Sequence, residues 1–324
     1  MQRRRLLHAA LIAAVAWLCA GALHAQIGDR PIRIIFPFAA GGSGDTLSRL
    51  VADKMRVSLN HTVIVEDRAG ADGRIGVNDV RTSEPDGTTL LLTPIAPMAI
   101  YQHVYSNLGY DPIKDFTPLS ELGTFDFGVA VGSQMPIKTV KELVAWAKAN
   151  PSLANYGIPG AGTLPQFLGV MLGRTAGIDL RAVPYHGSAA AVTDVVAGHI
   201  PLIITTTADL VQMHKAGRVR VLATSDKQRS PFLPDVPTLR ESGYDLVATG
   251  WYGMFAPAKT PPDVVERLNK AIVDAVHAPD IKERMEAFGL QPTGTTAAEF
   301  AVIQKADAEK WGPPVKASGF KPED

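Results

Sequence analysis

Two short glycine-rich stretches carry the residue types that could bind an anion. In the first, Gly41, Gly42, Ser43 and Asp45 follow the apolar run 32–36 and precede apolar residues at helical spacing. A strand, a glycine-rich turn and the start of a helix direct backbone N–H groups toward a ligand, and the helix dipole favours negative charge there. The chemistry predicted at this turn is therefore the binding of an anion.

The same turn fits two other interpretations. Asp45, placed by the pattern at the N-cap position, could simply cap the helix after an ordinary strand–helix turn. A nucleotide site agrees less well with the sequence, because Gly44 is followed by Asp45 instead of the Lys of a phosphate-binding loop, and no Gly-x-Gly-x-x-Gly spacing occurs. A turn that contains its own carboxylate suits a small carboxylate or an amino acid better than a polyphosphate.

A second stretch repeats this arrangement in the other half of the chain. Gly160, Ala161, Gly162 and Thr163 follow the expected strand 155–158, and Thr163 can cap the helix that comes next. Neither stretch contains Lys or Arg, so a carboxylate would be held by N–H groups, hydroxyls and water, each bond contributing on the order of 1.5–3 kcal/mol. We expect the two helix N-termini to face one cleft.

Tyr185 and Thr205 are further candidate ligand-binding residues, because each lies at the end of an expected strand. His186 could make binding pH-sensitive near neutrality, or it could be a surface residue. The best catalytic group would be His186 with Asp45 or Asp194, but no Gly-x-Ser-x-Gly motif accompanies them. The eight His residues show no His-x-x-x-His spacing. No catalytic residue, metal ligand or cofactor is predicted.

The order of the expected elements indicates an α/β fold. Short apolar runs at 32–36, 63–66 and 88–92 alternate with helical patterns, and Pro85-Asp86-Gly87 has the residue types of a tight turn. This alternation predicts a mainly parallel sheet covered by helices, with the loops after the strands forming any site. Three amphipathic helices are expected near the C-terminus, at 261–277, 281–288 and 297–310.

Composition and the N-terminal segment limit the class of protein. With 324 residues and 46% apolar content the chain can form two α/β domains, and its net charge of zero argues against a nucleic-acid or membrane-surface partner. Residues 1–25 have the basic start, apolar centre and small-residue end of a signal peptide, with an uncleaved anchor helix as the alternative. Cys19, the only Cys, lies inside this segment, so the mature chain would have no disulfide and no thiol nucleophile. We expect export to a bacterial periplasm.

Several motifs occur in order along nearly the whole mature chain. They are Pro-Ile-Arg-Ile-Ile-Phe-Pro-Phe-Ala-Ala-Gly-Gly-Ser-Gly-Asp (31–45), Val-Glu-Asp-Arg-Ala-Gly (65–70), Glu-Pro-Asp-Gly-Thr-Thr-Leu-Leu-Leu (84–92), Tyr-Asp-Pro-Ile-Lys-Asp-Phe-Thr-Pro (110–118), Asn-Tyr-Gly (155–157), Val-Pro-Tyr-His-Gly (183–187), Leu-Pro-Asp-Val-Pro-Thr (233–238) and Ala-Pro-Ala-Lys-Thr-Pro-Pro (256–262). In this ordered set the sequence resembles the Bug family, also called TctC-like proteins, which are the solute receptors of tripartite tricarboxylate transporters. Members of that family more often have Lys at His186 and Asp near Pro201, so the usual ligand preference is not carried over.

This resemblance implies an α/β, type II periplasmic-binding-protein fold, with two lobes, a cleft and two crossover strands. The expected boundaries are residues 26–124 for the first part of lobe 1, 125–248 for lobe 2 and 249–324 for the return segment of lobe 1. Closure would be a hinge motion about residues 123–127 and 247–251.

The same resemblance implies a function. A monomeric receptor would capture a small organic carboxylate in the cleft and hand it to membrane permease subunits of a tripartite tricarboxylate transporter. The alternatives are a sensor that presents its liganded face to a signalling partner, and an enzyme on the same fold. Dicarboxylates, amino acids, aromatic carboxylates and nicotinate-like compounds all fit the physics of the predicted site.

Overall fold

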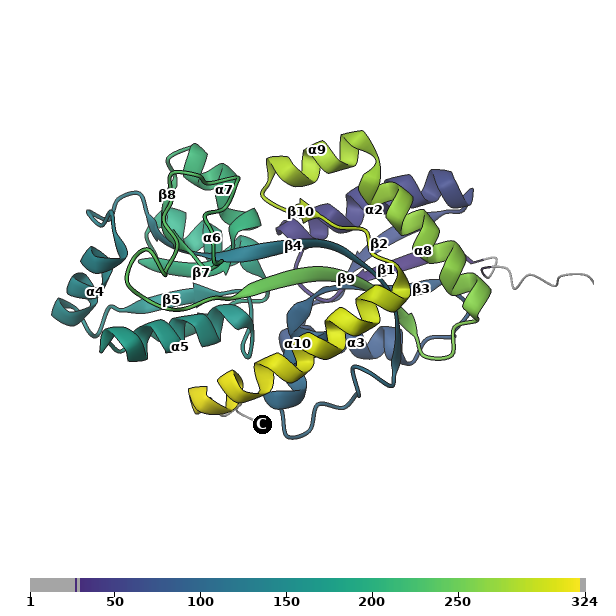
Figure 1. The fold of residues 1–324 in the computed structure, drawn as a ribbon, viewed down its shortest axis with the longest axis horizontal. Coiled ribbons are helices and arrows are strands. Elements are labelled where there is room, and N and C mark those ends of the chain that lie inside the picture. The colour runs from purple at the N-terminus through teal and green to yellow at the C-terminus, as the bar shows by residue number, and fades with distance from the viewer. Residues whose placement is uncertain (1–26, 28–29, 321–324) are drawn as a thin grey trace, which may run out of the picture.

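The computed structural model describes residue 27 and residues 30–320, and the expected signal peptide lies outside these residues. The chain forms two α/β lobes that lie side by side and are joined by two long strands (Figure 1). Among the helices that the structure describes, none is both long and apolar enough to cross a membrane.

The first lobe is organised around a parallel sheet. Its elements are β1 (Ile32–Phe36), α2 (Ser43–Leu59), β2 (Val63–Asp67), the one-turn helix η1 (Ala71–Gly73), α3 (Arg74–Arg81), β3 (Thr89–Pro94) and the short helices η2 (Ala96–Ile100) and η3 (Tyr101–His103). Strand β1 pairs in parallel with both β2 and β3. It is almost fully buried because helices cover both faces of the sheet, which explains its uninterrupted apolar sequence.

Two antiparallel strands connect the lobes. Strand β4 (Phe116–Gly132) runs without a break for 17 residues, and β9 (Thr249–Pro257) pairs with its first part. The sequence predicted only the segment 127–131 as a strand. Pro118 is unfavourable inside a strand, so the first part of β4 was not predicted. This proline is tolerated because the register with β9 shifts between Pro118 and Ser120. From Phe127 onward, β4 pairs instead with strands of the second lobe.

The second lobe repeats the α/β arrangement. Its elements are α4 (Val140–Ala149), β5 (Asn155–Ile158), α5 (Leu164–Ala176), β6 (Arg181–Pro184), α6 (Ser188–Ala197), β7 (Leu202–Thr206), α7 (Thr207–Lys215) and β8 (Val219–Thr224). Strand β5 pairs in parallel with β6 and β7, whereas β4 pairs antiparallel with β7 and β8. Helix α4 begins with a reciprocal capping box formed by Thr139 and Glu142.

The C-terminal segment returns to the first lobe. It contains α8 (Pro262–His277), α9 (Pro279–Ala287), the short strand β10 (Gln291–Pro292) and α10 (Ala297–Ser318). Helix α10 was expected to end at Lys310, but it continues through Pro313 and Pro314. Its end reaches the second lobe, where Arg174 of α5 donates hydrogen bonds to the backbone carbonyls of Ala317 and Ser318. Figure 1 shows α10 running diagonally from the first lobe toward α5 of the second.

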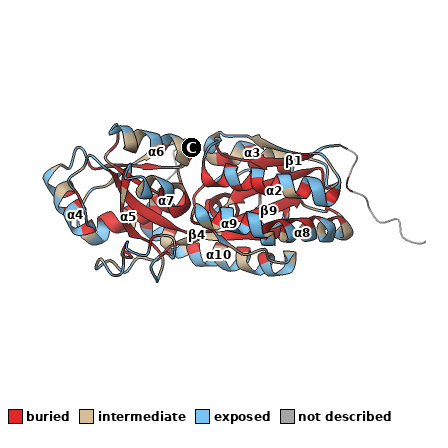
Figure 2. Ribbon diagram, turned by 90° about the horizontal axis from the view of Figure 1, so that it is seen from above, coloured by how far each residue is buried: buried red, intermediate tan, exposed pale blue. Residues whose placement is uncertain are grey.

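A large hydrophobic core extends through both lobes, and a smaller separate cluster lies within the second lobe. The large core includes Ile34 of β1, Phe125 and Val129 of β4, and Ile204 of β7. In Figure 2 the buried strands lie between helices whose outer faces are exposed. The crossover strands thus connect the lobes by packing as well as by the chain itself.

Candidate ligand cavity between the lobes

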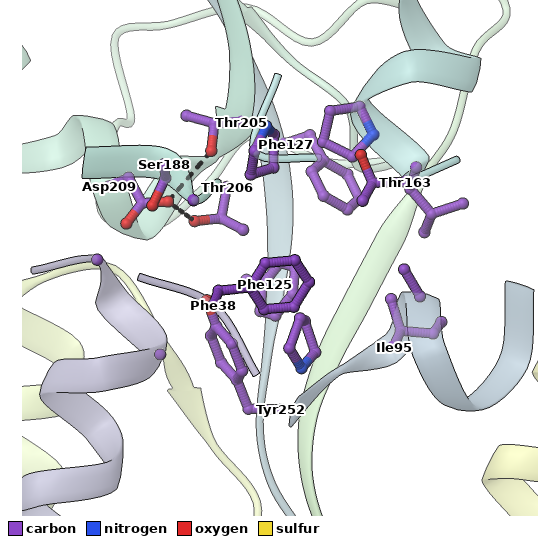
Figure 3. A pocket seen from close by; sticks show the side chains of 18 of the residues that line it. Phe38, Ile95, Phe125, Phe127, Thr163, Ser188, Thr205, Thr206, Asp209 and Tyr252 are labelled. Carbon is purple, nitrogen blue, oxygen red and sulfur yellow. Dashed lines mark hydrogen bonds between the residues drawn. The ribbon is translucent and has the colours of Figure 1, made fainter. Parts of the chain in front are cut away.

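A cavity lies between the lobes, beside the crossover strands (Figure 3). Its volume is about 50 Å³. It therefore holds a few waters in this closed arrangement, and a larger ligand needs the lobes to separate slightly. The lining consists of Phe36, Phe38, Ala39, Gly42, Gly44, Pro94, Ile95, Ala96, Phe125, Phe127, Pro159, Thr163, Leu164, Pro165, Gly187, Ser188, Thr205, Thr206, Asp209 and Tyr252.

Four helices begin at this cavity. The first residues of α2, α5, α6 and α7, or the residues just before them, contribute Gly42, Thr163, Ser188 and Thr206 to its wall. The first-turn N–H groups of a helix have no partner within the helix, and together they carry a partial positive charge. The cavity wall therefore presents partial positive charges from helix N-termini, while its lining contains the carboxylate of Asp209 and no Lys, Arg or His.

The first glycine-rich turn is held by carboxylates of the protein itself. The N–H of Gly41 donates to Oδ2 of Asp45 at 2.9 Å, and Oδ1 of Asp45 forms an ion pair with Arg49 at 2.8 Å. Asp45 is the third residue of α2 and Gly42 is the N-cap, so Asp45 fixes the turn from within the helix instead of capping it as expected. The N–H of Ser43 donates to Oδ1 of Asp209 in the other lobe at 2.8 Å.

The second turn shows the reciprocal arrangement. The N–H of Ala161 donates to Oδ1 of Asp72 in the first lobe at 2.9 Å. Within the turn, the N–H of Gly162 donates to Oε1 of Gln166 at 2.7 Å, and the hydroxyl of Thr163 donates to the carbonyl of Gly160 at 2.7 Å. The N–H groups of Ala161 and Gly162 are therefore bonded to protein groups in this closed arrangement.

The predicted site residues fall into two groups. Gly42, Thr163 and Thr205 line the cavity. The structure places the others outside its lining, and they are Gly41, Ser43, Asp45, Gly160, Ala161, Gly162 and Tyr185. Most residues of this second group belong to the two glycine-rich turns that border the cavity.

Tyr185 and Thr205 illustrate the difference. The hydroxyl of Tyr185 donates to Asp194 at 2.7 Å, and burial together with this carboxylate raises the pKa of Tyr185 to about 12. The hydroxyl of Thr205 faces the cavity and donates to Oδ2 of Asp209 at 3.1 Å, and that of Thr206 donates to the same atom at 2.7 Å. Asp209 is thus fixed by three hydrogen bonds, one of them from the opposite lobe.

A further contact closes the cleft. The N–H of Ala39 donates to the carbonyl of His186 at 2.9 Å, which joins the loop after β1 to the loop before α6. With the Ser43–Asp209 and Ala161–Asp72 bonds, it makes three backbone-mediated contacts between facing loops. These contacts hold the two lobes closed on each other in this structure.

Comparison with known proteins identifies the family. A family model described as the tripartite tricarboxylate transporter family receptor, TctC, matches residues 47–320. The chain belongs to the TctC family. A relative from Cupriavidus necator, the UPF0065 protein in the gbd 5' region, is 33% identical and aligns over 96% of this chain and 98% of its own length.

Solved structures agree with the assignment of this chain to the TctC family. The periplasmic binding protein BugD is 31% identical, with a TM-score of 0.87 over 91% of this chain and 100% of that chain. MatC from Rhodopseudomonas palustris with bound malate is 27% identical, with a TM-score of 0.84 over 88% of this chain and 99% of that chain. The predicted family and the predicted two-lobed periplasmic-binding-protein fold are confirmed.

Most of the apolar residues that line the cavity were not predicted from the sequence. Phe125 and Phe127 are two residues apart on β4, so they face the same side, and Tyr252 of β9 packs against Phe125 with ring centroids 4.9 Å apart. Alternating Phe residues beside an apolar second crossover strand were the available signal. Asp209, in the first turn of α7, was also not predicted as a site residue.

The residues that the structure describes contain no cluster of potential metal ligands. Within them, no group of three or more His, Cys, Asp or Glu side chains is placed to hold a metal ion. The cavity has hydroxyls, N–H groups and one carboxylate as its polar groups. Such groups can recognise a ligand through hydrogen bonds and apolar contact.

Proposed function

We propose that this TctC-family solute-binding protein captures a small carboxylate between its lobes and delivers it to a tripartite tricarboxylate-type transporter. The family assignment supports the transporter as partner, and the relative MatC has been seen with bound malate. Residues 1–25 would direct export, after which the receptor works as a monomer in the periplasm.

The observation that carries this proposal is the convergence of four helix N-termini on a closed cavity without a cationic side chain. Backbone dipoles stabilise a carboxylate there without the free-energy penalty of desolvating a buried cation. Ser188 adds a hydroxyl to the same wall, whereas the hydroxyls of Thr163 and Thr205 donate to Gly160 and Asp209 in this structure. Gly42, Thr163 and Thr205 are therefore the predicted site residues proposed to contact the ligand, while the remaining ones hold the turns in position.

Two measurements test the proposal. Isothermal titration of the purified protein with organic acids and with their uncharged amides should show saturable binding of acids only. Uptake of a bound acid into vesicles that contain the permease subunits should then require the receptor. Binding without receptor-dependent uptake would contradict the transport role, whereas equal binding of acid and amide would contradict anion recognition.

A further inference from the structure

Protein carboxylates already lie at the starts of three of the four helices around the cavity. The start of α2 already faces two carboxylates, Asp45 in its own first turn and Asp209 from the other lobe. Helix α7 has Asp209 in its first turn, and the turn before α5 is bonded to Asp72. Helix α6 differs from the other three. Among the described residues, its first turn contains no acidic residue, and the turn before it makes no hydrogen bond to a carboxylate. Each protein carboxylate offsets part of the positive potential that a ligand would use.

The opposite wall is a cluster of aromatic rings. Phe125 lies 5.5 Å from Phe127 at an interplanar angle of 90° and 4.9 Å from Tyr252 at 48°, and Phe36 lies 5.9 Å from Phe38. Figure 3 shows Phe38, Phe125 and Tyr252 facing the hydroxyls of the second lobe across the cavity. The hydroxyl of Tyr252 shares a hydrogen bond with Ser43 at 2.9 Å, and its ring packs against Phe125. Such rings favour a flat apolar group through edge and offset-stacked contacts.

From these two observations we infer that the cavity selects a monocarboxylate with a flat, apolar body. This inference rests on the proposed carboxylate-binding function and narrows its substrate class. The single carboxylate interacts with the helix N-termini of the second lobe and the hydroxyl of Ser188. The rings of the first lobe and crossover strands enclose the body.

A second carboxylate on the ligand is disfavoured for two reasons. Among the rings it would lose water without gaining a cation, because the lining contains no Lys, Arg or His. Near the hydroxyls it would add a second ligand charge beside Asp209, which the first carboxylate already adjoins and whose own carboxylate is fixed by Thr205, Thr206 and the N–H of Ser43. Like charges in a partly buried site repel, so Asp209 acts as a specificity-determining residue against diacids.

The test compares ligands of the same shape and different charge. Terephthalate and 4-nitrobenzoate differ in one charged group of nearly equal size, so calorimetric titration with both separates charge from fit. We expect 4-nitrobenzoate to bind at least about tenfold more tightly than terephthalate, a difference of about 1.4 kcal/mol. Benzamide should not bind, and adipate should bind more weakly than benzoate.

The outcomes separate this inference from the function on which it rests. Tighter binding of terephthalate or adipate than of the aromatic monoacids would overturn the inference and leave a carboxylate receptor. Binding of none of these acids, with no copurified acid in the denatured protein, would overturn both.

Two variants test the assigned roles. Asp209→Asn keeps the shape and an acceptor for Ser43, so it should reduce the preference for 4-nitrobenzoate over terephthalate at least about threefold. Asp235→Asn removes the same charge from an exposed position and should leave the preference unchanged. Phe38→Leu should weaken benzoate binding at least about fivefold. An unchanged preference in Asp209→Asn or unchanged benzoate binding in Phe38→Leu would overturn the role given to that residue.

Discussion

The carboxylate of Asp209, at the start of α7, accepts a 2.8 Å hydrogen bond from the backbone N–H of Ser43, at the start of α2 in the opposite lobe. The N-terminus of one helix is thereby bonded to an acid in the first turn of another, across the cleft. Asp72 and Ala161 form the reciprocal bond from the first lobe to the second at 2.9 Å. The two bonds link the glycine-rich turns that border the cavity, so closure is built into the facing loops.

Removing the Asp209 side chain should destabilise the closed protein. Asp209→Ala deletes a charge-assisted bond to Ser43 and leaves the hydroxyls of Thr205 and Thr206 without their acceptor. We expect the free energy of unfolding to fall by about 2 kcal/mol in urea denaturation. Asp209→Asn, which keeps an acceptor, should lose less, and Asp235→Ala on the surface should change it by less than about 0.5 kcal/mol. Equal stability of Asp209→Ala and wild type would contradict the bond's contribution.

Removing both interlobe carboxylates should open the cleft. In Asp72→Ala/Asp209→Ala the N–H groups of Ser43 and Ala161 lose their partners in the other lobe. Because the hinge strands remain paired at Phe125–Gly250, we expect a separation of intact lobes rather than unfolding. Small-angle X-ray scattering without ligand should give a larger radius of gyration for the double variant. The same radius for both proteins would mean that these bonds do not hold the closed state.

Bulk at Gly42 should block ligand binding without unfolding either lobe. Gly42 has φ −85°, which any residue can adopt, so a substitution there is not limited by backbone strain. A Cβ atom at this position would lie 2.6 Å from Oγ of Ser188 across the cleft. Gly42→Val should therefore weaken carboxylate binding at least about tenfold in titration, and Gly42→Ala should have a smaller effect because Oγ of Ser188 can rotate away. Wild-type affinity in Gly42→Val would be inconsistent with closure around the ligand at this loop.

The stability of the protein should depend on pH through Asp126, which lies on β4 between Phe125 and Phe127. Burial raises the pKa of Asp126 from 3.8 to about 6, and its bond from the Thr207 hydroxyl offsets only part of this effect. Between about pH 4 and pH 6 the folded state then binds more protons than the unfolded state, so the free energy of unfolding falls as pH rises.

The matching variant isolates this contribution. Asp126→Asn should be more stable than wild type at pH 7 by on the order of 2 kcal/mol, with the difference vanishing near pH 4. Burial also raises the pKa of Glu121, so the wild-type curve contains a second contribution of the same sign, which the comparison cancels. Urea denaturation at several pH values checks this, and parallel curves for the two proteins would contradict it.

Local patterns predicted much of the fold because they depend on neighbours in sequence. The apolar run of β1 and the Thr139 capping box needed no knowledge of distant residues. The full length of β4 could not be predicted, since Pro118 is accommodated only through a register shift against β9, which is more than a hundred residues away in the chain. Helix α10 likewise continues past Pro313, where its end packs on α5.

The candidate site was harder to predict than the elements that position it. Both glycine-rich turns could be located from sequence, yet whether a given N–H faces the cavity or a protein carboxylate depends on tertiary contacts. Ser43 and Asp209 are 166 residues apart in sequence, and nothing local to either one indicates the other. The aromatic wall is assembled from β1, β4 and β9, so it exists only once the crossover strands pair.

The most direct test of the central claim is the melting temperature of the purified protein with matched acid and amide pairs, beginning with benzoate and benzamide. If the helix N-termini recognise a carboxylate, an acid at about 100 times its dissociation constant should add about 2.7 kcal/mol and raise the melting temperature by about 5 °C. Its amide should leave the melting temperature unchanged. No shift with any acid, together with no copurified acid in mass spectra of the denatured protein, would contradict the account.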